Sequence, residues 1–147
     1  MDSVGRQVIR QAFRSRATKC GSKKVTQKAV DWLARYISSE ELLQDLKLVV
    51  LEACSNVVLH SYSGSEPGDM EVRIAVEPGC KVVIEVLDWG KPYTGPTGDV
   101  FALQQDNETG RGMYIIAQLV DRYYFGHEQS TNKLIMEKQI EERLWKP

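Results

Sequence analysis

Glu52 and Asn56 are two residues whose chemistry and spacing fit together. They lie four residues apart in a stretch of helical periodicity, so their side chains are about 40° apart around the helix axis. The carboxylate can orient a hydroxyl or a water molecule and accept its proton. The amide oxygen can be one of about six oxygen ligands of a magnesium ion whose other ligands are phosphates and water. The alternative is an ordinary Glu–Asn pair on a helix.

Asp88 and Gly90 form a second group. Asp88 follows an apolar strand predicted over residues 82–87, so its carboxylate emerges at the strand end. There it can accept a hydrogen bond from an exocyclic amine, the group that marks adenine. Gly90 allows the backbone to approach a flat ring closely. The alternative is a strand-ending aspartate followed by a turn glycine.

Gly110, Arg111 and Gly112 form a third group, between a long loop and a helix predicted to begin at Met113. Free amides at a helix start favour an anion, and glycines remove side chains that would block it. Arg111 can add a charge-assisted contact to phosphate. The alternative is a flexible loop followed by a helix start. In this order and spacing, the three groups predict a pocket for an ATP–magnesium complex.

Two helices are predicted before the first strand pair. Residues 23–37 carry apolar side chains at helical spacing, which indicates one buried stripe. Ser38 and Glu41 match a capping box, which predicts the start of a second helix running to about His60. This second helix is apolar over much of its circumference and must be largely enclosed. The Glu–Asn pair lies beside its main apolar face, where a cleft wall would be.

Alternating apolar and polar residues predict strands over 70–76 and 82–86, joined by a turn at Pro78-Gly79. The other predicted elements are an edge strand within 4–13, a long functional or mobile loop over 91–109, a short helix over 113–120, and a closing hairpin with strands at 122–125 and 134–140. This order predicts one domain over residues 1–147. Its fold class is α/β in the α+β sense: a two-layer sandwich with a mixed, mainly antiparallel sheet and helices on one face.

The bulk composition excludes several classes of protein. With 19 basic and 20 acidic residues, the formal net charge of -1 gives no indication of a nucleic-acid or membrane partner. Three cysteines without a Cys-x-x-Cys pair argue against a disulfide framework or a zinc site. Without a signal segment or an apolar run of about 20 residues, we expect a soluble cytoplasmic protein. A basic run from Arg6 to Lys28 is either a solvated face or a docking surface for an acidic partner.

The three groups together resemble the GHKL ATPase superfamily of Bergerat-fold proteins, which includes gyrase, histidine kinases and MutL. The resemblance covers about residues 42–140 and rests on the stretches LVVLEACSNVVLHSY, VIEVLDWGKPY and ETGRGMYIIAQLVD. Within the superfamily, the chain is most similar to the anti-sigma factor serine/threonine kinases, the RsbW and SpoIIAB type. Pro92 replaces the last glycine of the general Asp-x-Gly-x-Gly pattern, and Pro92-Tyr93 is typical of that branch.

This resemblance implies that Glu52 is the catalytic base and that Asn56 is the Mg2+ ligand. It also implies that Asp88 reads adenine and that Gly90 lines the same site.

By the same resemblance, Gly110 and Gly112 belong to a phosphate loop, and residues 91–109 form an ATP lid. Asn132 matches a threonine or asparagine that family members carry before the last strand, and it is a further candidate contact to the nucleotide.

The expected activity follows from what the chain lacks around this domain. We expect no transducer region and no phosphoacceptor histidine before the Glu52 helix, so phosphate goes to a separate protein, to water, or nowhere. By resemblance, the leading hypothesis is a serine/threonine kinase that phosphorylates an anti-anti-sigma (STAS) protein and binds a sigma factor, with a homodimer expected. One alternative is a non-catalytic module in which ATP only shapes partner binding. Another is a degenerate fold that binds no nucleotide.

Overall fold

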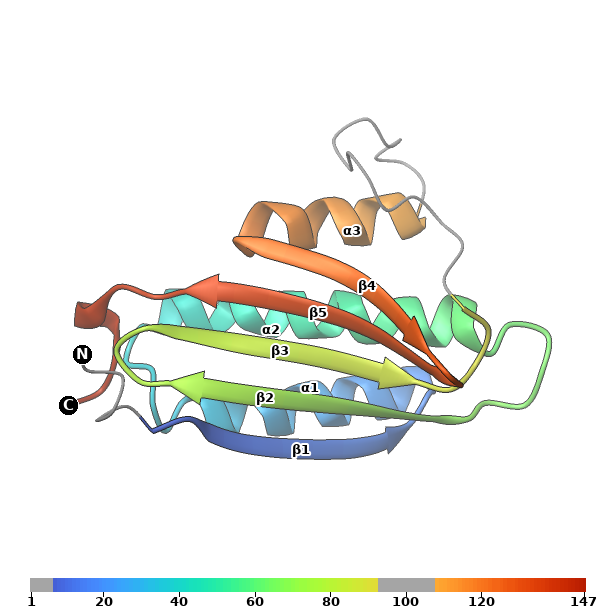
Figure 1. Cartoon of the computed structure of the whole chain (residues 1–147), viewed down its shortest axis with the longest axis horizontal. Helices are drawn as coiled ribbons and strands as arrows, with labels where there is room; N and C mark the ends of the chain where they lie inside the picture. The colour runs from blue at the N-terminus through green and yellow to red at the C-terminus, as the bar shows by residue number, and fades with distance from the viewer. Residues whose placement is uncertain (1–6, 93–107) are drawn as a thin grey trace.

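The computed structural model describes residues 7–92 and 108–147. Over these residues, helices and strands form two layers (Figure 1). The elements, in chain order, are β1 (Ile9–Arg16), α1 (Lys19–Leu33), α2 (Glu40–Asn56), the π-helical turn η2 (Val57–Ser61), β2 (Asp69–Glu77), β3 (Lys81–Asp88), α3 (Glu108–Leu119), β4 (Arg122–Glu128), β5 (Thr131–Gln139) and the short turn η4 (Glu142–Leu144). The predicted order of strands and helices is confirmed.

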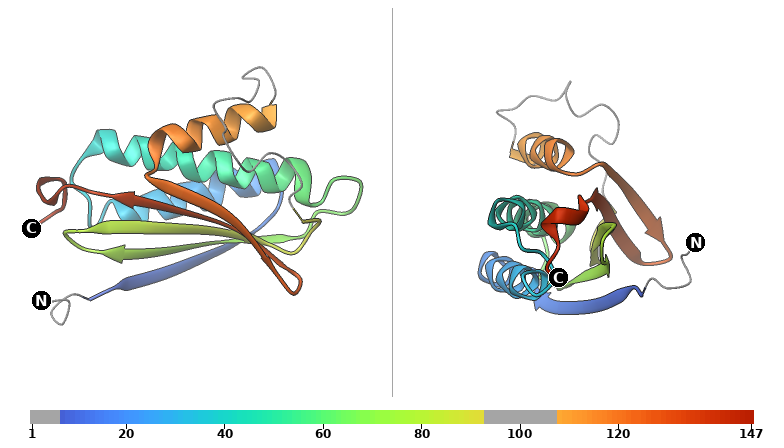
Figure 2. Two further views of the ribbon diagram at one scale, coloured as in Figure 1. Left: turned by 45° about the horizontal axis from the view of Figure 1, so that its top comes forward. Right: turned by 90° about the vertical axis from the view of Figure 1, so that its left-hand side faces the viewer.

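The described strands form one antiparallel sheet in the order β1-β2-β3-β5-β4. The three α-helices lie against one face of this sheet, as the end-on view shows (Figure 2). Alternate strand residues such as Ile74, Ile84 and Met136 are buried beneath the helices. The predicted two-layer α+β sandwich is therefore confirmed, and β1 is an edge strand as expected.

The other face of the sheet carries no helix in the part of the chain that the structure describes (Figure 2). On this face, Glu71 forms ion pairs with Arg14 at 2.9 Å and with Arg73 at 2.5 Å. Arg16 pairs with Asp69 at 3.1 Å. Two arginines of the N-terminal basic run are therefore paired with carboxylates of β2.

The start of α2 differs from the prediction by one residue. Ser39, rather than Ser38, is the N-cap, and its hydroxyl accepts a hydrogen bond from the Leu42 amide at 3.1 Å. Ser38 instead donates its backbone amide to the Leu144 carbonyl at 2.8 Å. The prediction was wrong here because a tertiary contact with the C-terminal segment holds Ser38 outside the helix.

No helix in the described ranges is long and apolar enough to cross a bilayer.

Several further boundaries differ from the predictions. β1 spans Ile9–Arg16 rather than lying within 4–13, and α1 spans Lys19–Leu33 rather than 23–37. α3 begins at Glu108, so the helix already contains Gly110 and Gly112 rather than following them. The closing hairpin is also longer than predicted, because β4 extends to Glu128 and β5 begins at Thr131. Most of the predicted lid, residues 93–107, lies outside the described residues.

Candidate functional site

Three polar residues that the sequence singled out are buried around one cleft. Asp88 is 5% exposed, Asn132 is 6% exposed and Asn56 is 8% exposed. The cleft measures about 210 Å3 and is also lined by residues including His60 and Lys91. Burying polar side chains costs free energy unless they are hydrogen-bonded. Their concentration here therefore marks a polar site at the margin of an otherwise apolar core.

The pairing of three neighbouring strands builds this site. Asp88 on β3 lies opposite Asn132 on β5, and Asn132 lies opposite His127 on β4. Opposite residues in antiparallel strands project from the same face of the sheet. The three side chains therefore form one row across the sheet, on the face that the helices cover.

Asp88 has one carboxylate oxygen engaged and one available. Its Oδ1 accepts a hydrogen bond from the Gly90 amide at 3.0 Å and another from Asn132 Nδ2 at 2.8 Å. Its Oδ2 accepts no hydrogen bond from the described residues. A buried carboxylate held in this way can accept one more hydrogen bond, from an amine in the cleft.

A second set of contacts fixes the turn that follows Asp88. The Tyr62 hydroxyl donates to the Asp69 carbonyl at 2.8 Å and accepts from the Trp89 amide at 3.1 Å. Burial is the main cause that raises the pKa of Tyr62 above its ordinary value of 10.0, so the phenol stays protonated and keeps both bonds.

Gly90 is required by the same turn. A Cβ on Gly90 would lie 2.1 Å from the Ser61 carbonyl oxygen, and this oxygen accepts a hydrogen bond from the Lys91 amide at 2.6 Å. Ser61 is the last residue of η2, the π-helical turn that directly follows Asn56. Gly90 thus makes room for the Ser61 backbone, whereas the sequence suggested room for a flat ring. A π-helical turn shifts the residues after Asn56 around the helix axis and brings this carbonyl to the β3 turn.

Gly112, of the third predicted group, lies beside Glu52 and Asn56, which form the first. A Cβ on Gly112 would lie 2.9 Å from Glu52 Oε1 and 3.7 Å from Asn56 Oδ1. The absence of a side chain at Gly112 therefore lets α3 approach the Glu–Asn pair of α2. Asn56 Nδ2 donates to the sulfur of Met113 at 3.2 Å, which turns its Oδ1 toward the same space.

The remaining residues of the third group lie in the first turn of α3. The amides of the first three residues of a helix have no partner within the helix, and in α3 these include the amide of Gly110. The Gly110 amide is thus among those that can face an anion, while the amides of Arg111 and Gly112 lie beyond them. The Arg111 side chain is exposed on α3.

Sequence reasoning missed His127, Tyr62 and Ser61. Each acts through a backbone group or through a residue opposite it on another strand, so no local spacing identifies it. Asn132 was placed just before the last strand, whereas it lies inside β5.

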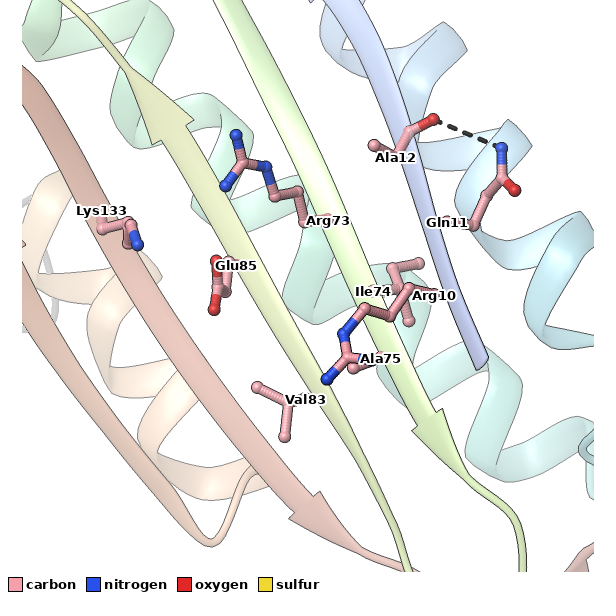
Figure 3. Close-up of a pocket in the computed structure, with 9 residues that line it drawn as sticks. All are labelled: Arg10, Gln11, Ala12, Arg73, Ile74, Ala75, Val83, Glu85 and Lys133. Carbon is pink, nitrogen blue, oxygen red and sulfur yellow. Dashed lines mark hydrogen bonds between the residues drawn. The ribbon is translucent and has the colours of Figure 1, made fainter. Parts of the chain in front are cut away.

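A larger hollow of about 540 Å3 lies on the helix-free face of the sheet (Figure 3). Arg73, Glu85 and Lys133 project over it, but none of the candidate site residues lines it. The cleft beside Asp88 is therefore the stronger candidate.

Comparison with known proteins assigns the chain to a family. Residues 16–138 match the family described as histidine kinase-like ATPase domain. The chain belongs to that family. Membership in this ATPase family implies that the chain binds ATP.

Similar curated proteins are serine-protein kinases named RsbW. The chain is 30% identical over 120 residues to RsbW of Listeria monocytogenes, covering 71% of this chain and 73% of the relative. It is 32% identical over 87 residues to RsbW of Bacillus licheniformis, covering 54% of each chain, and 34% identical over 91 residues to RsbW of Bacillus pumilus. The match to the Bacillus proteins thus spans about half their length.

The residues of this ATPase domain can supply only part of the coordination of a magnesium ion. Asn56 Oδ1 is the oxygen that the structure turns toward Gly112. No group of three His, Cys, Asp or Glu side chains that could hold a metal occurs in the described ranges. Magnesium bound together with phosphates needs only one or two protein oxygens, so one amide oxygen fits this chemistry.

Proposed function

We propose that this ATPase domain is a serine/threonine protein kinase of the anti-sigma factor type. In this proposal Glu52 is the catalytic base, Asn56 the magnesium ligand and Asp88 the acceptor for the adenine amine. The first turn of α3, with Gly110 and Arg111, binds phosphate oxygens. The resemblance of the chain to serine-protein kinases supports the activity.

The close approach of Gly112 to Glu52 and Asn56 carries the proposal. A Cβ at position 112 would lie 2.9 Å from Glu52 Oε1. The start of α3, which offers free amides to an anion, therefore lies next to a carboxylate and an amide oxygen. Phosphoryl transfer needs an anion cradle, a metal ligand and a group that positions the nucleophile within one site.

The proposed reaction uses the side chains as follows. An acceptor hydroxyl oxygen forms a bond to the γ-phosphorus of ATP, and the bond from that phosphorus to the β,γ-bridging oxygen breaks. ADP leaves, and the hydroxyl proton passes to the Glu52 carboxylate. Magnesium, when bound, would offset negative charge on the phosphates. Glu52 is half-buried on α2, so its side chain is partly accessible while its position is held by the helix.

The proposed partners are a small anti-anti-sigma (STAS) protein as phosphate acceptor and a sigma factor as binding client, in the cytoplasm. A homodimer and a single domain over residues 1–147 belong to the same proposal. The RsbW relatives support this choice over other members of the superfamily.

The test is a transfer assay with radiolabelled Mg-ATP and a STAS protein encoded beside this chain. We expect phosphoserine or phosphothreonine on the STAS protein. Glu52→Gln is expected to abolish transfer and to keep the affinity for fluorescent ADP within about three-fold. Glu41→Gln, the same change at an exposed residue in the first turn of α2, is the matched control and should retain transfer. Absence of phosphoamino acid, with ADP binding intact, would refute the kinase proposal.

The alternative proposal is a binding module in which ATP shapes the surface for a partner without transfer. Glu52→Gln separates the two proposals, because a module would control its partner equally well in both proteins. A third possibility, a domain that binds no nucleotide, is tested by thermal unfolding with Mg-ADP. A ligand at about 100 times its dissociation constant stabilises the folded state by about 2.7 kcal/mol. No shift at millimolar Mg-ADP would therefore exclude nucleotide binding at a useful affinity.

A further inference from the structure

Asn132 holds its side-chain amide in a single orientation. Its Nδ2 lies 2.8 Å from Asp88 Oδ1, 3.1 Å from the Gly90 carbonyl oxygen and 3.1 Å from the Lys91 carbonyl oxygen. All three partners can only accept hydrogen bonds while Asp88 is ionised. The opposite orientation would place Asn132 Oδ1 against three oxygens and is excluded by repulsion. The amide nitrogen therefore faces Asp88, and the amide oxygen faces away from it.

The amide oxygen of Asn132 meets His127. His127 Nδ1 lies 2.6 Å from Asn132 Oδ1. Because Oδ1 can only accept, Nδ1 must carry the hydrogen, and this selects one tautomer of a neutral ring. His127 is thus the donor at one end of a directed chain of hydrogen bonds that runs through Asn132 to Asp88 Oδ1. The pairing of β4, β5 and β3 places these residues in one row.

We propose that His127 is a positioning residue that sets the preference of the cleft for adenine. By donating to Asn132, it keeps the amide nitrogen of Asn132 on Asp88 Oδ1, and this leaves Asp88 Oδ2 free to accept from the base. The inference rests on the proposed binding of ATP with Asp88 at the adenine amine. It deepens that proposal by naming a residue that acts through two others.

Hypoxanthine is the base that tests this chain of hydrogen bonds. Adenine carries an exocyclic amine, which donates, whereas hypoxanthine carries a carbonyl oxygen at the same place, which accepts. A correctly oriented carboxylate therefore favours ADP over IDP, and a disturbed one loses that preference. The two nucleotides share ribose and phosphates, so the ratio of their affinities reports on the base contact alone.

Asparagine and aspartate at position 127 form a matched pair. Both place an atom on Cγ where histidine has Nδ1, but asparagine can donate there and an aspartate carboxylate can only accept. His127→Asn can keep the chain of hydrogen bonds in its direction. His127→Asp sets two acceptors against each other while the three oxygens still oppose a turn of the amide, so the Asn132 side chain is pushed out of place and its hydrogen bond to Asp88 is weakened. These two variants have the same shape and differ in charge and in the ability to donate, and the uncharged His127→Leu separates these two differences.

The experiment measures dissociation constants of ADP and IDP for the full chain and its variants, by isothermal titration at fixed magnesium. We expect the wild-type protein to bind ADP at least about ten-fold more tightly than IDP. His127→Asn is expected to keep this ratio within about two-fold, and His127→Asp to lower it about ten-fold. His127→Leu adds no charge and cannot donate, so its ratio should also fall.

Glu128→Gln is the control, because Glu128 is the exposed neighbour of His127 on β4. Its ratio should equal that of the wild type. Equal ratios for His127→Asn and His127→Asp would overturn the role of His127 while leaving ATP binding intact. Equal affinity of the wild type for ADP and IDP would also overturn it. Failure of the wild type to bind ADP at all would instead refute the proposed function.

Discussion

Replacing Gly112 by alanine separates the packing of α3 from the chemistry of the cleft. The added Cβ would lie 2.9 Å from Glu52 Oε1, whereas ordinary contacts of a Cβ begin near 3.4 Å. The Glu52 carboxylate must therefore move by about half an ångström, the difference between these two distances. Asn56 Oδ1, at 3.7 Å, is in ordinary contact and need not move. The change thus displaces one functional group and leaves its neighbour in place.

The expected effects on stability and on turnover differ in size. Alanine in the interior of a helix is more favourable than glycine by up to about 1 kcal/mol. The atom that must yield is the tip of a flexible side chain, so the free energy of unfolding should stay within about 1 kcal/mol of wild type. Misplacing a catalytic group on this scale lowers turnover up to about 100-fold, or about 2.7 kcal/mol of transition-state stabilisation.

Urea denaturation measures the first quantity, and the rate of phosphate transfer from saturating Mg-ATP to the acceptor protein measures the second. Gln118→Ala, at an exposed position of the same helix, is the control and should change neither by a measurable amount. A Gly112→Ala protein with full turnover would refute the need for Glu52 at this position. A loss of more than about 2 kcal/mol in unfolding free energy would show that the contact serves packing instead.

Three further outcomes follow from the structure. Asn56→Ala removes an oxygen ligand, so it should weaken ADP binding about ten-fold in magnesium but not in EDTA, as measured by titration with fluorescent ADP. An equal loss of affinity in both conditions would contradict a metal role for Asn56. Ser39→Ala should lower the free energy of unfolding by about 1 kcal/mol in urea, since the Leu42 amide loses its cap, and an unchanged value would reject Ser39 as the cap. Burial raises the pKa of the Cys54 thiol from 9.0 to about 12. The protonated thiol therefore contributes stability that is complete below pH 9 and is lost as the pH rises toward 12. In Cys54→Ala, the free energy of unfolding should fall less steeply over this range, as measured by urea denaturation at each pH.

The order of elements could be predicted because hydrophobic periodicity is a local property of the chain. Residues 70–76 alternate as a half-buried strand must, and the apolar residues from 42 to 57 recur as an enclosed helix requires. Element boundaries were less predictable. Ser38 satisfies the capping pattern with Glu41, whereas Ser39 has Leu42 three residues on. Only the hydrogen bond of Ser38 to Leu144 excludes Ser38 from the helix.

The candidate site was predictable to the extent that its parts are contiguous. The four-residue spacing of Glu52 and Asn56 already places both on one side of α2, because the helix repeat determines it. The position of Asp88 at the end of an apolar strand is likewise a local fact. The proximity of Gly112 to Glu52 is not local, since it depends on how α3 packs against α2.

By itself, the sequence determined which residues share a helix side or a strand end, because backbone geometry repeats every few residues. Only the tertiary structure decided that Asp88, Asn132 and His127 stand in one row, since strand register joins positions far apart in the chain. The direction of their hydrogen bonds follows from that register as well. A side chain that has both a donor and an acceptor, such as that of Asn132, can take two orientations. Only a partner at bonding distance decides between them, because one orientation is then repulsive.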